Sequence, residues 1–202
     1  MKIMVMAAGA VGGYFGSIMA KNHDVLLIAR GEHLHRIQEN GLHVRSITSG
    51  DFSSRVLAAD TPPPHYVPDV IRFCVKAYHY EEACAVITPT VGSQTTILSL
   101  QNGIGCGDFL SSHFGKDKVL LGAAYIEASR SEPGVVQEHG GACRIALGDQ
   151  SGNLTDRAVR VGNLLKDCNI DHHLSEDIMS VSYTHLRAHE TLRYLVCRLL
   201  LE

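Results

Sequence analysis

The stretch KIMVMAAGAVGGYFG, residues 2–16, decides the fold of this chain. It begins with a short apolar run that contains Ile3 and Val5, continues with small residues from Ala7 to Gly13, and ends in apolar residues at helical spacing. A short apolar run is typical of a buried strand, and the small residues after it leave room for a sharp turn. The stretch therefore predicts a strand, a tight turn and a helix in immediate succession.

A turn of this kind can bind phosphate, because the first amides of a helix have no partner within the helix and carry the positive end of its dipole. The usual fingerprint is G-x-G-x-x-G. Gly9 and Gly12 hold its second and third glycine positions, but Ala7 holds the first, which makes the tight turn. If the turn needs a positive φ there, alanine costs roughly 1 kcal/mol, and we expect a slightly displaced loop that binds less well. The alternative interpretation is close packing of strand and helix without a ligand.

The second strand is expected at residues 24–29, DVLLIA, which would complete a βαβ unit. An acidic residue after this strand usually binds the ribose 2′-hydroxyl of NAD. Here the acid is absent and Arg30 follows the strand. A guanidinium at this point can bind a 2′-phosphate through paired N–H groups, so the sequence indicates NADP rather than NAD. A solvated arginine at a helix start is the alternative.

Two further polar residues follow predicted strands. The strand at residues 69–75 leads directly into Lys76, and the strand at 95–100 leads into Asn102. Ligands of open α/β sheets bind at the carboxyl ends of the strands, which is why these two residues are candidates for the site. An ordinary solvated lysine and an ordinary Asn-Gly turn are the alternatives.

The rest of the chain continues the alternation of strands and helices. We expect helices over residues 10–22, 31–40, 81–87, 108–114 and 153–168, and strands over 119–124 and 170–174. Residues 42–60 suggest a hairpin around Ser49-Gly50, and residues 125–147 suggest a β-ribbon turned at Pro133-Gly134 and again near Gly140-Gly141. The predicted fold class is therefore α/β, Rossmann-like, with a mostly parallel, doubly wound sheet.

Composition narrows the function classes. The chain has 202 residues, is 45% apolar and carries a net charge near −3, without a basic stripe that would indicate nucleic acid. We see no signal peptide and no apolar run that could cross a membrane, and expect a cytoplasmic protein. The six cysteines show no CxxC spacing and are expected to be reduced. The twelve histidines, among them His33, His35, His172 and His173, show no metal-site spacing, so we expect no metal.

Several blocks in order carry a family resemblance: AAGAVGGYFG, ARGEHL, VKAYHYEEA, SLQNGIG, YIEASRSEPGVV and IALGD. From residue 1 to about residue 180 the chain closely resembles ketopantoate reductase, also called 2-dehydropantoate 2-reductase. The resemblance implies reduction of 2-dehydropantoate to pantoate by NADPH, on the route to coenzyme A. It also implies that Arg30 meets the 2′-phosphate, that Lys76 and Asn102 lie against the nicotinamide end, and that Asn102 is near the substrate. The pyrophosphate would be held by Ala7, Ala8, Gly9, Ala10, Val11 and Gly12.

In that family the proton donor is a lysine in a W-x-K motif at the start of a second, all-helical domain. Counted from Ile178, its position falls near His185, where the sequence does not resemble the family. We therefore expect no catalytic residue in this chain. Residues 181–191 and 194–202 can instead be written back as the two parts of a transposase-based sequencing adapter. The expected division is a Rossmann-type NADP-binding domain at 1–174, the start of a lost helical domain at 175–180, and an adapter-derived tail at 181–202; a native amphipathic helix is the alternative for the tail.

Two other functions stay open at this point. A catalytically silent NADP-binding sensor that regulates a partner would need neither the lysine nor the helical domain. A related reductase of another 2-oxo acid would share this half and differ in its substrate residues. We expect a small-molecule substrate and neither a nucleic-acid nor a membrane partner, and association into homo-oligomers is open.

Overall fold

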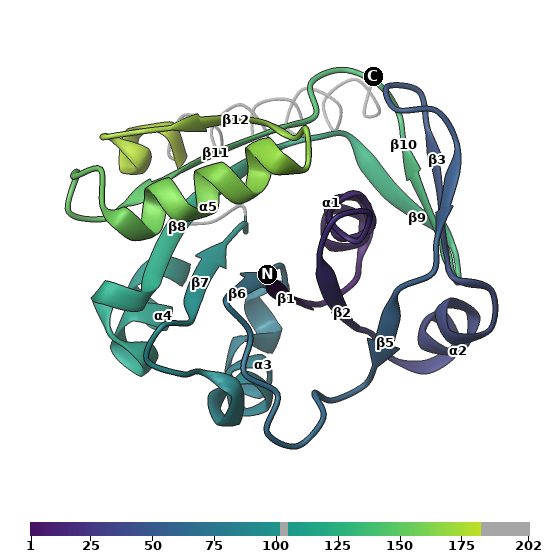
Figure 1. The fold of residues 1–202 in the computed structure, drawn as a ribbon, viewed down its shortest axis with the longest axis horizontal. Helices are drawn as coiled ribbons and strands as arrows, with labels where there is room; N and C mark the ends of the chain where they lie inside the picture. Colours follow the sequence, from purple (N-terminus) through teal and green to yellow (C-terminus); the bar gives the residue numbers. More distant parts are fainter. Residues whose placement is uncertain (102–104, 183–202) are drawn as a thin grey trace, which may run out of the picture.

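The larger of two sheets forms the centre of the molecule (Figure 1). The structure, a computed structural model, describes residues 1–101 and 105–182. The order of the sheet is β12-β11-β8-β7-β6-β1-β2-β5, and all its pairs are parallel except β11 with β8. Its strands are β1 (Lys2–Met6), β2 (Asp24–Ile28), β5 (Leu57–Ala59), β6 (Val70–Phe73), β7 (Thr96–Ser99), β8 (Val119–Tyr125), β11 (Arg144–Asp149) and β12 (Asp171–Leu174).

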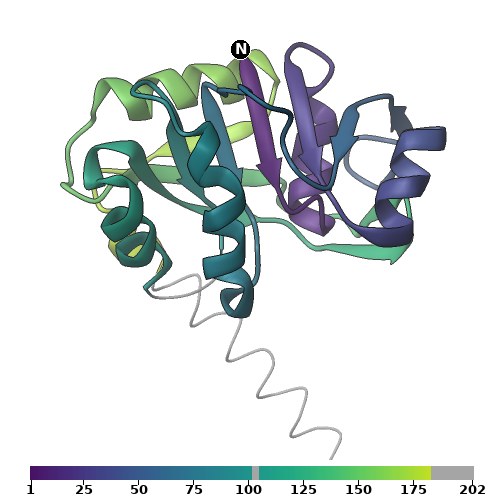
Figure 2. The same ribbon diagram turned by 90° about the horizontal axis from the view of Figure 1, so that it is seen from below.

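Helices cover both faces of this sheet (Figure 2). Alternate residues of β1 show why: Ile3 and Val5 join the apolar cluster under α1 (Ala10–Met19) and α5 (Asp156–Asp167), whereas Met4 and Met6 join the cluster under α3 (Tyr80–Ile87) and α4 (Cys106–Phe114). Helix α2 (Gly31–Asn40) packs beside β5. Short 3₁₀ turns lie at Ala77–His79, Thr88–Thr90 and Lys116–Lys118. The predicted α/β fold with a mostly parallel, doubly wound sheet is confirmed.

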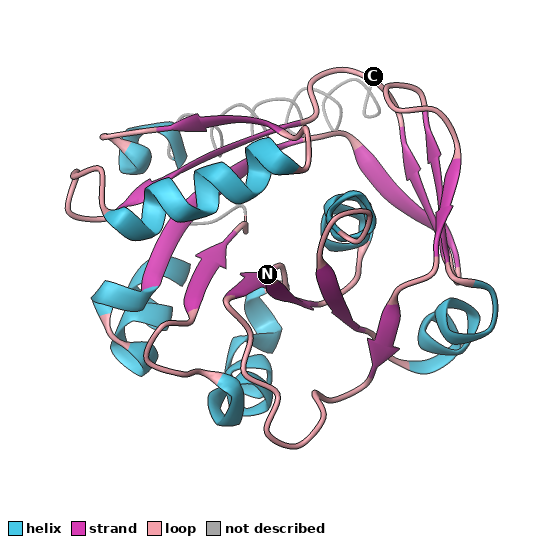
Figure 3. Cartoon of the chain, viewed as in Figure 1, coloured by secondary structure: helices cyan, strands magenta, loops and turns pink. Residues whose placement is uncertain are grey.

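The second sheet stands to one side of the first (Figure 3). Its order is β4-β3-β10-β9, with β3 (Leu42–Ser46), β4 (Phe52–Ser54), β9 (Ala128–Glu132) and β10 (Val135–Glu138). The predicted hairpin is β3 and β4, and the predicted ribbon is correct at its turn Pro133-Gly134, which joins β9 and β10. Its second turn, near Gly140-Gly141, is wrong, because β11 leaves the ribbon and pairs with β8 and β12 in the main sheet. What the sequence did not indicate is that β10 pairs in parallel with β3, and that β5 returns to the edge of the main sheet.

The glycines of α1 let this helix lie between the two sheets. A Cβ atom on Gly16 would lie 2.9 Å from Leu27 Cδ2, on the side of the main sheet. A Cβ atom on Gly13 would lie 3.0 Å from Val136 Cγ2 and 3.1 Å from Leu42 Cδ2, on the side of the second sheet. Glycine therefore allows close contact on both sides, which ordinary side chains would prevent.

A buried carboxylate ties the second sheet together. Glu138 is 1% exposed and accepts hydrogen bonds from Ser46 Oγ at 2.5 Å, from the backbone N–H of Thr48 at 3.0 Å, and from the backbone N–H of Gly140. The Ser49 hydroxyl of the same loop lies 2.9 Å from the Tyr14 hydroxyl on α1. The network thus connects β10, the β3–β4 loop and the helix that follows the first turn.

Two sequence predictions concern features that the chain should lack, and a third concerns its division into domains. In the described residues, no helix is long and apolar enough to cross a membrane. Nor do residues 1–101 and 105–182 contain a group of three His, Cys, Asp or Glu side chains that could hold a metal ion. The predicted domain division at residues 174 and 180 stays a prediction; the chain is helical from 178 to 182, and most of the proposed tail lies outside the described residues.

Candidate nucleotide-binding site

The turn after β1 does need a positive φ at Ala7, the condition under which the sequence predicts a steric cost. Ala7 has a φ of 76°, in the left-handed region that favours glycine. The backbone N–H of Ala8 then donates to Ile28 O at 2.8 Å, which fastens the turn to β2. Alanine at the first glycine position therefore carries a real steric cost, yet the chain keeps the turn.

The two glycines of the turn have different surroundings. A Cβ atom on Gly12 would collide with the carbonyl oxygen of Ala7 and come within 3.0 Å of Val5 Cγ1, so Gly12 allows the helix to pack on the strand. A Cβ atom on Gly9 would meet no atom within 4 Å, so the chain is open there. The turn is closely packed at its helix side and open at Gly9.

The amino end of α1 offers free hydrogen-bond donors beside this open side. The first i to i−4 bond of the helix runs from Gly13 N to Gly9 O at 2.8 Å, so the amides of residues 10–12 have no acceptor within the helix. Gly9 is the N-cap residue and provides no side-chain cap, and no acidic residue lies in the first turn. Nothing in the first turn neutralises the positive end of the helix dipole, and an anion would be stabilised there.

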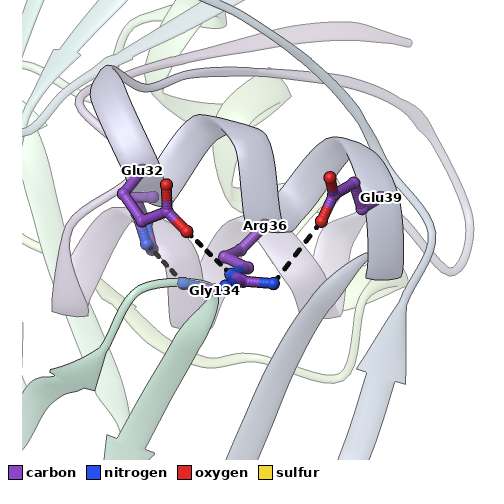
Figure 4. A network of polar contacts seen from close by, with 5 residues as sticks. Glu32, Arg36, Glu39 and Gly134 are labelled. Carbon is purple, nitrogen blue, oxygen red and sulfur yellow. Dashed lines mark hydrogen bonds and ion pairs between the residues drawn. The ribbon is translucent and has the colours of Figure 1, made fainter.

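His33, a buried residue of α2, is hydrogen-bonded to this turn. Its Nδ1 accepts the backbone N–H of Gly134 at 2.9 Å, so its Nε2 carries the proton and donates to Ala8 O at 2.8 Å. Figure 4 shows Gly134 beside the ion pairs that Arg36 makes with Glu32 and Glu39 on the same helix. Burial is the main cause that lowers the pKa of His33, which keeps the imidazole neutral for these two bonds.

Four parallel strands end at one edge, where the predicted site residues lie. Met6 pairs with Ile28 of β2 and with Phe73 of β6, and Phe73 pairs with Ser99 of β7, so these strands end at one level. Arg30 and Lys76 follow β2 and β6 at this edge, and both are exposed. Asn102 lies outside the described residues.

Arg30 is engaged with a carboxylate from another element. Its Nη2 lies 2.9 Å from Glu82 Oε1 on α3, and the two side chains are 54% and 53% exposed. The other oxygen of Glu82 lies 3.3 Å from His79 Nδ1. Arg30 and Glu82 line a shallow pocket together with Asp60 and the apolar side of Leu34. The guanidinium is therefore available at the surface, but in this structure it faces an acidic neighbour.

A chain of contacts places Lys76 on the same side as Arg30. Beyond Glu82, the ring of His79 lies 4.5 Å from the ring of Tyr78, and Lys76 Nζ lies 6.0 Å from the Tyr78 ring. The structure thus brings the glycine turn, Arg30 and Lys76 to one edge of the main sheet. Because β1 lies between β6 and β2, a ligand along this edge could meet the free amides of α1 between Lys76, which follows β6, and Arg30, which follows β2.

Two residues at this site were not predicted from the sequence. His33 was considered only as a metal ligand and rejected, because its role depends on Gly134, far away in the chain. Glu82 stands in an ordinary helical pattern, and only the pairing of β1 with β2 and β6 brings its helix beside Arg30. The sequence signal that could have found His33 is a histidine at the third residue of the helix after the second strand.

Comparison with known proteins identifies the family of the chain. Residues 3–152 match the family described as Ketopantoate reductase PanE/ApbA. The chain is 34% identical over 185 residues to a 2-dehydropantoate 2-reductase from Pyrococcus abyssi, covering 89% of this chain and 58% of the relative. A solved 2-dehydropantoate 2-reductase from Geobacter metallireducens is 30% identical, with a TM-score of 0.84 over 91% of this chain and 60% of that one.

A more distant structure shares the fold alone. The D-mandelate dehydrogenase solved with NADH and anilino(oxo)acetate is 24% identical, with a TM-score of 0.82 over 91% of this chain and 59% of that one. The chain spans between 45% and 63% of the length of the curated 2-dehydropantoate 2-reductases that it matches. Since the family match covers most of the described residues, this chain belongs to the ketopantoate reductase family.

Proposed function

We propose that this chain is the nucleotide-binding part of a 2-dehydropantoate 2-reductase that uses NADPH to reduce 2-dehydropantoate to pantoate. The observation that carries the proposal is the open turn at Gly9 beside the unpaired amides of α1, with Arg30 and Lys76 at the same edge. These groups fit a dinucleotide phosphate, because the backbone supplies donors and the arginine supplies a bidentate cation. Family membership supplies the reaction class.

In this proposal each part of the site has one task. The turn from Ala7 to Gly12 would hold the pyrophosphate, Arg30 the 2′-phosphate, and Lys76 with Asn102 the nicotinamide end, Asn102 also meeting the substrate. When bound, NADPH supplies the hydride that reduces the ketone carbon. The protein's task is to orient cofactor and ketone, and His33 helps by fixing the carbonyl of Ala8 behind the turn.

We propose that these 202 residues do not supply the proton for the reaction. The sequence contains no tryptophan, so it has no W-x-K motif, and we propose that the polypeptide binds NADPH but does not turn over. Loss of a general acid lowers the rate by about 10² to 10⁴, and loss of substrate orientation lowers it further. We further propose that residues 181–202 are translated adapter and not part of the family sequence.

Two measurements on the purified chain test the proposal. Fluorescence titration should show saturable binding of NADPH, and Gly9→Asp, which places a carboxylate at the open turn, should abolish it. An assay of 2-dehydropantoate-dependent NADPH oxidation should show no turnover beside an intact relative. Turnover at the relative's rate would contradict the missing proton donor, whereas absence of nucleotide binding would contradict the proposed site. Recovery of the uninterrupted gene separates the enzyme from the sensor: a W-x-K motif and a helical domain after residue 180 would favour the enzyme, and their absence would favour the sensor.

A further inference from the structure

The pocket beside Arg30 contains an acid that the sequence pattern did not show. Resting on the proposed function, we infer that Glu82 acts as the acidic residue of the ribose subsite, so that the chain accepts NADH as well as NADPH. In nucleotide-binding folds of this class, NAD preference comes from a carboxylate after the second strand that accepts the ribose 2′-hydroxyl. Here the residue after the second strand is Arg30, and the carboxylate comes from Glu82 on α3. Its Oε1 lies 2.9 Å from Arg30 Nη2.

The fixed charges of the pocket favour this reading. Arg30 supplies one positive charge, while Glu82 and Asp60 supply two negative charges on the same lining. The 2′-phosphate of NADPH would add a second anion next to Glu82, whereas a 2′-hydroxyl would add none. Like charges in one pocket repel each other, so a pocket that contains both Glu82 and Asp60 does not select strongly for phosphate.

The ion pair also means that a 2′-phosphate must compete for the arginine. An exposed pair of this kind contributes little to stability, so Glu82 can leave Arg30 at small cost. His79 Nδ1, at 3.3 Å from the other carboxylate oxygen, gives Glu82 a second partner when it does so. With NADH bound, Glu82 can stay on Arg30 and accept the 2′-hydroxyl. Glu82 therefore sets the ratio of the two affinities and does not take part in the chemistry.

The experiment compares two neighbouring glutamates on one helix. The dissociation constants of NADPH and NADH are measured by fluorescence titration for the wild type, for Glu82→Gln, and for Glu81→Gln as the control. Glu81 is exposed and makes no ion pair within the described residues, so its variant removes the same charge from the same helix without touching Arg30. Circular dichroism confirms that each variant is folded, which is expected because both side chains are exposed.

We expect the wild type to bind NADPH less than about tenfold more tightly than NADH. Glu82→Gln should raise this preference by roughly another tenfold, through tighter NADPH and weaker NADH, and Glu81→Gln should change it by less than about twofold. Equal changes in both variants, or an unchanged preference in Glu82→Gln, would overturn the inference while leaving the proposed function in place. If no form binds either nucleotide, the proposed function and this inference fail together.

Discussion

Arg72 is a native residue that we expect to lower the stability of this fold. Replacing it with methionine should therefore raise the free energy of unfolding. The residue lies in β6 at the centre of the main sheet and is 0% exposed. Its Nη1 has only the sulfur of Met19 as a partner, at 3.9 Å, and neither Nε nor Nη2 has a hydrogen-bond partner among the described residues. A guanidinium has five N–H donors, so most of its hydrogen-bonding capacity is unused.

Within residues 1–101 and 105–182, Arg72 makes no ion pair with an anion. Cys74 and Cys168 are the two thiols whose charge would act on Arg72, but burial raises the pKa of both, so they are neutral at ordinary pH. Besides the Met19 sulfur, the guanidinium carbon lies 5.2 Å from the centre of the Phe15 ring, a contact worth about 2 kcal/mol when buried. Two unpaired buried nitrogens cost about 1 to 3 kcal/mol each, and apolar replacement of buried charges stabilises other proteins by about 1 to 4 kcal/mol.

We therefore expect Arg72→Met to raise the free energy of unfolding by about 2 kcal/mol, which shifts the melting temperature by roughly 4 to 8 °C for a chain of this size. Urea denaturation followed by circular dichroism measures the free energy, and calorimetry measures the melting temperature. Arg45→Met is the matched control, since Arg45 also lies in a strand but is 55% exposed in its pair with Glu132, and it should change stability by less than about 0.5 kcal/mol. A loss of stability in Arg72→Met would refute the reasoning.

Three further predictions follow from the turn and from the second sheet. Ala7→Gly should raise the free energy of unfolding by about 0.5 to 1 kcal/mol, because relief of the positive φ exceeds the entropy cost of glycine, and it should tighten NADPH in a titration. His33 has a pKa lowered by burial, so the unfolded state binds its proton first and stability should fall as the pH drops below about 6.5. His33→Gln should reduce this loss, measured by denaturation at about pH 7.5 and pH 5.5. Burial acts to raise the pKa of Glu138, but its hydrogen bonds from Ser46, Thr48 and Gly140 outweigh this and lower it, so its stabilisation is present at neutral pH and is lost as the pH falls through the lowered value. Glu138→Gln should cost about 2 kcal/mol at neutral pH and remove that acid sensitivity, in the same assay.

The parts of the fold that could be predicted are those encoded locally. An apolar run followed by small residues is enough to predict β1, the turn and α1, because burial and steric room are properties of the residues themselves. The same holds for the strands before Arg30 and Lys76, whose position at the carboxyl edge follows from parallel pairing. The expectation at Ala7 also depended only on backbone sterics: its condition, a positive φ, is met at 76°, while the weaker binding that should follow stays a prediction.

The parts that could not be predicted depend on pairs of residues far apart in the chain. The pairing of β10 with β3 joins Val135 to His43, and neither sequence specifies the other. The strand containing Arg72 was predicted, but an arginine within an apolar run gives no indication of whether its side chain finds a partner. The position of Glu82 beside Arg30 could not be predicted for the same reason. The sequence pattern places the acid directly after the second strand, whereas the fold brings one from α3.

The second sheet explains how the turn can be rigid despite an unfavourable residue in it. Gly134, in the β9–β10 turn, donates to the histidine that holds Ala8, and Ser49, in the β3–β4 loop, lies 2.9 Å from the Tyr14 hydroxyl on the helix after the turn. Both contacts come from the sheet that packs against the outer side of α1, so the turn is fixed from two directions. Donors that are already in place lose little conformational entropy when a ligand binds, which lowers the cost of binding. The strain at Ala7 can persist because its neighbours, and not its own preference, determine the backbone there.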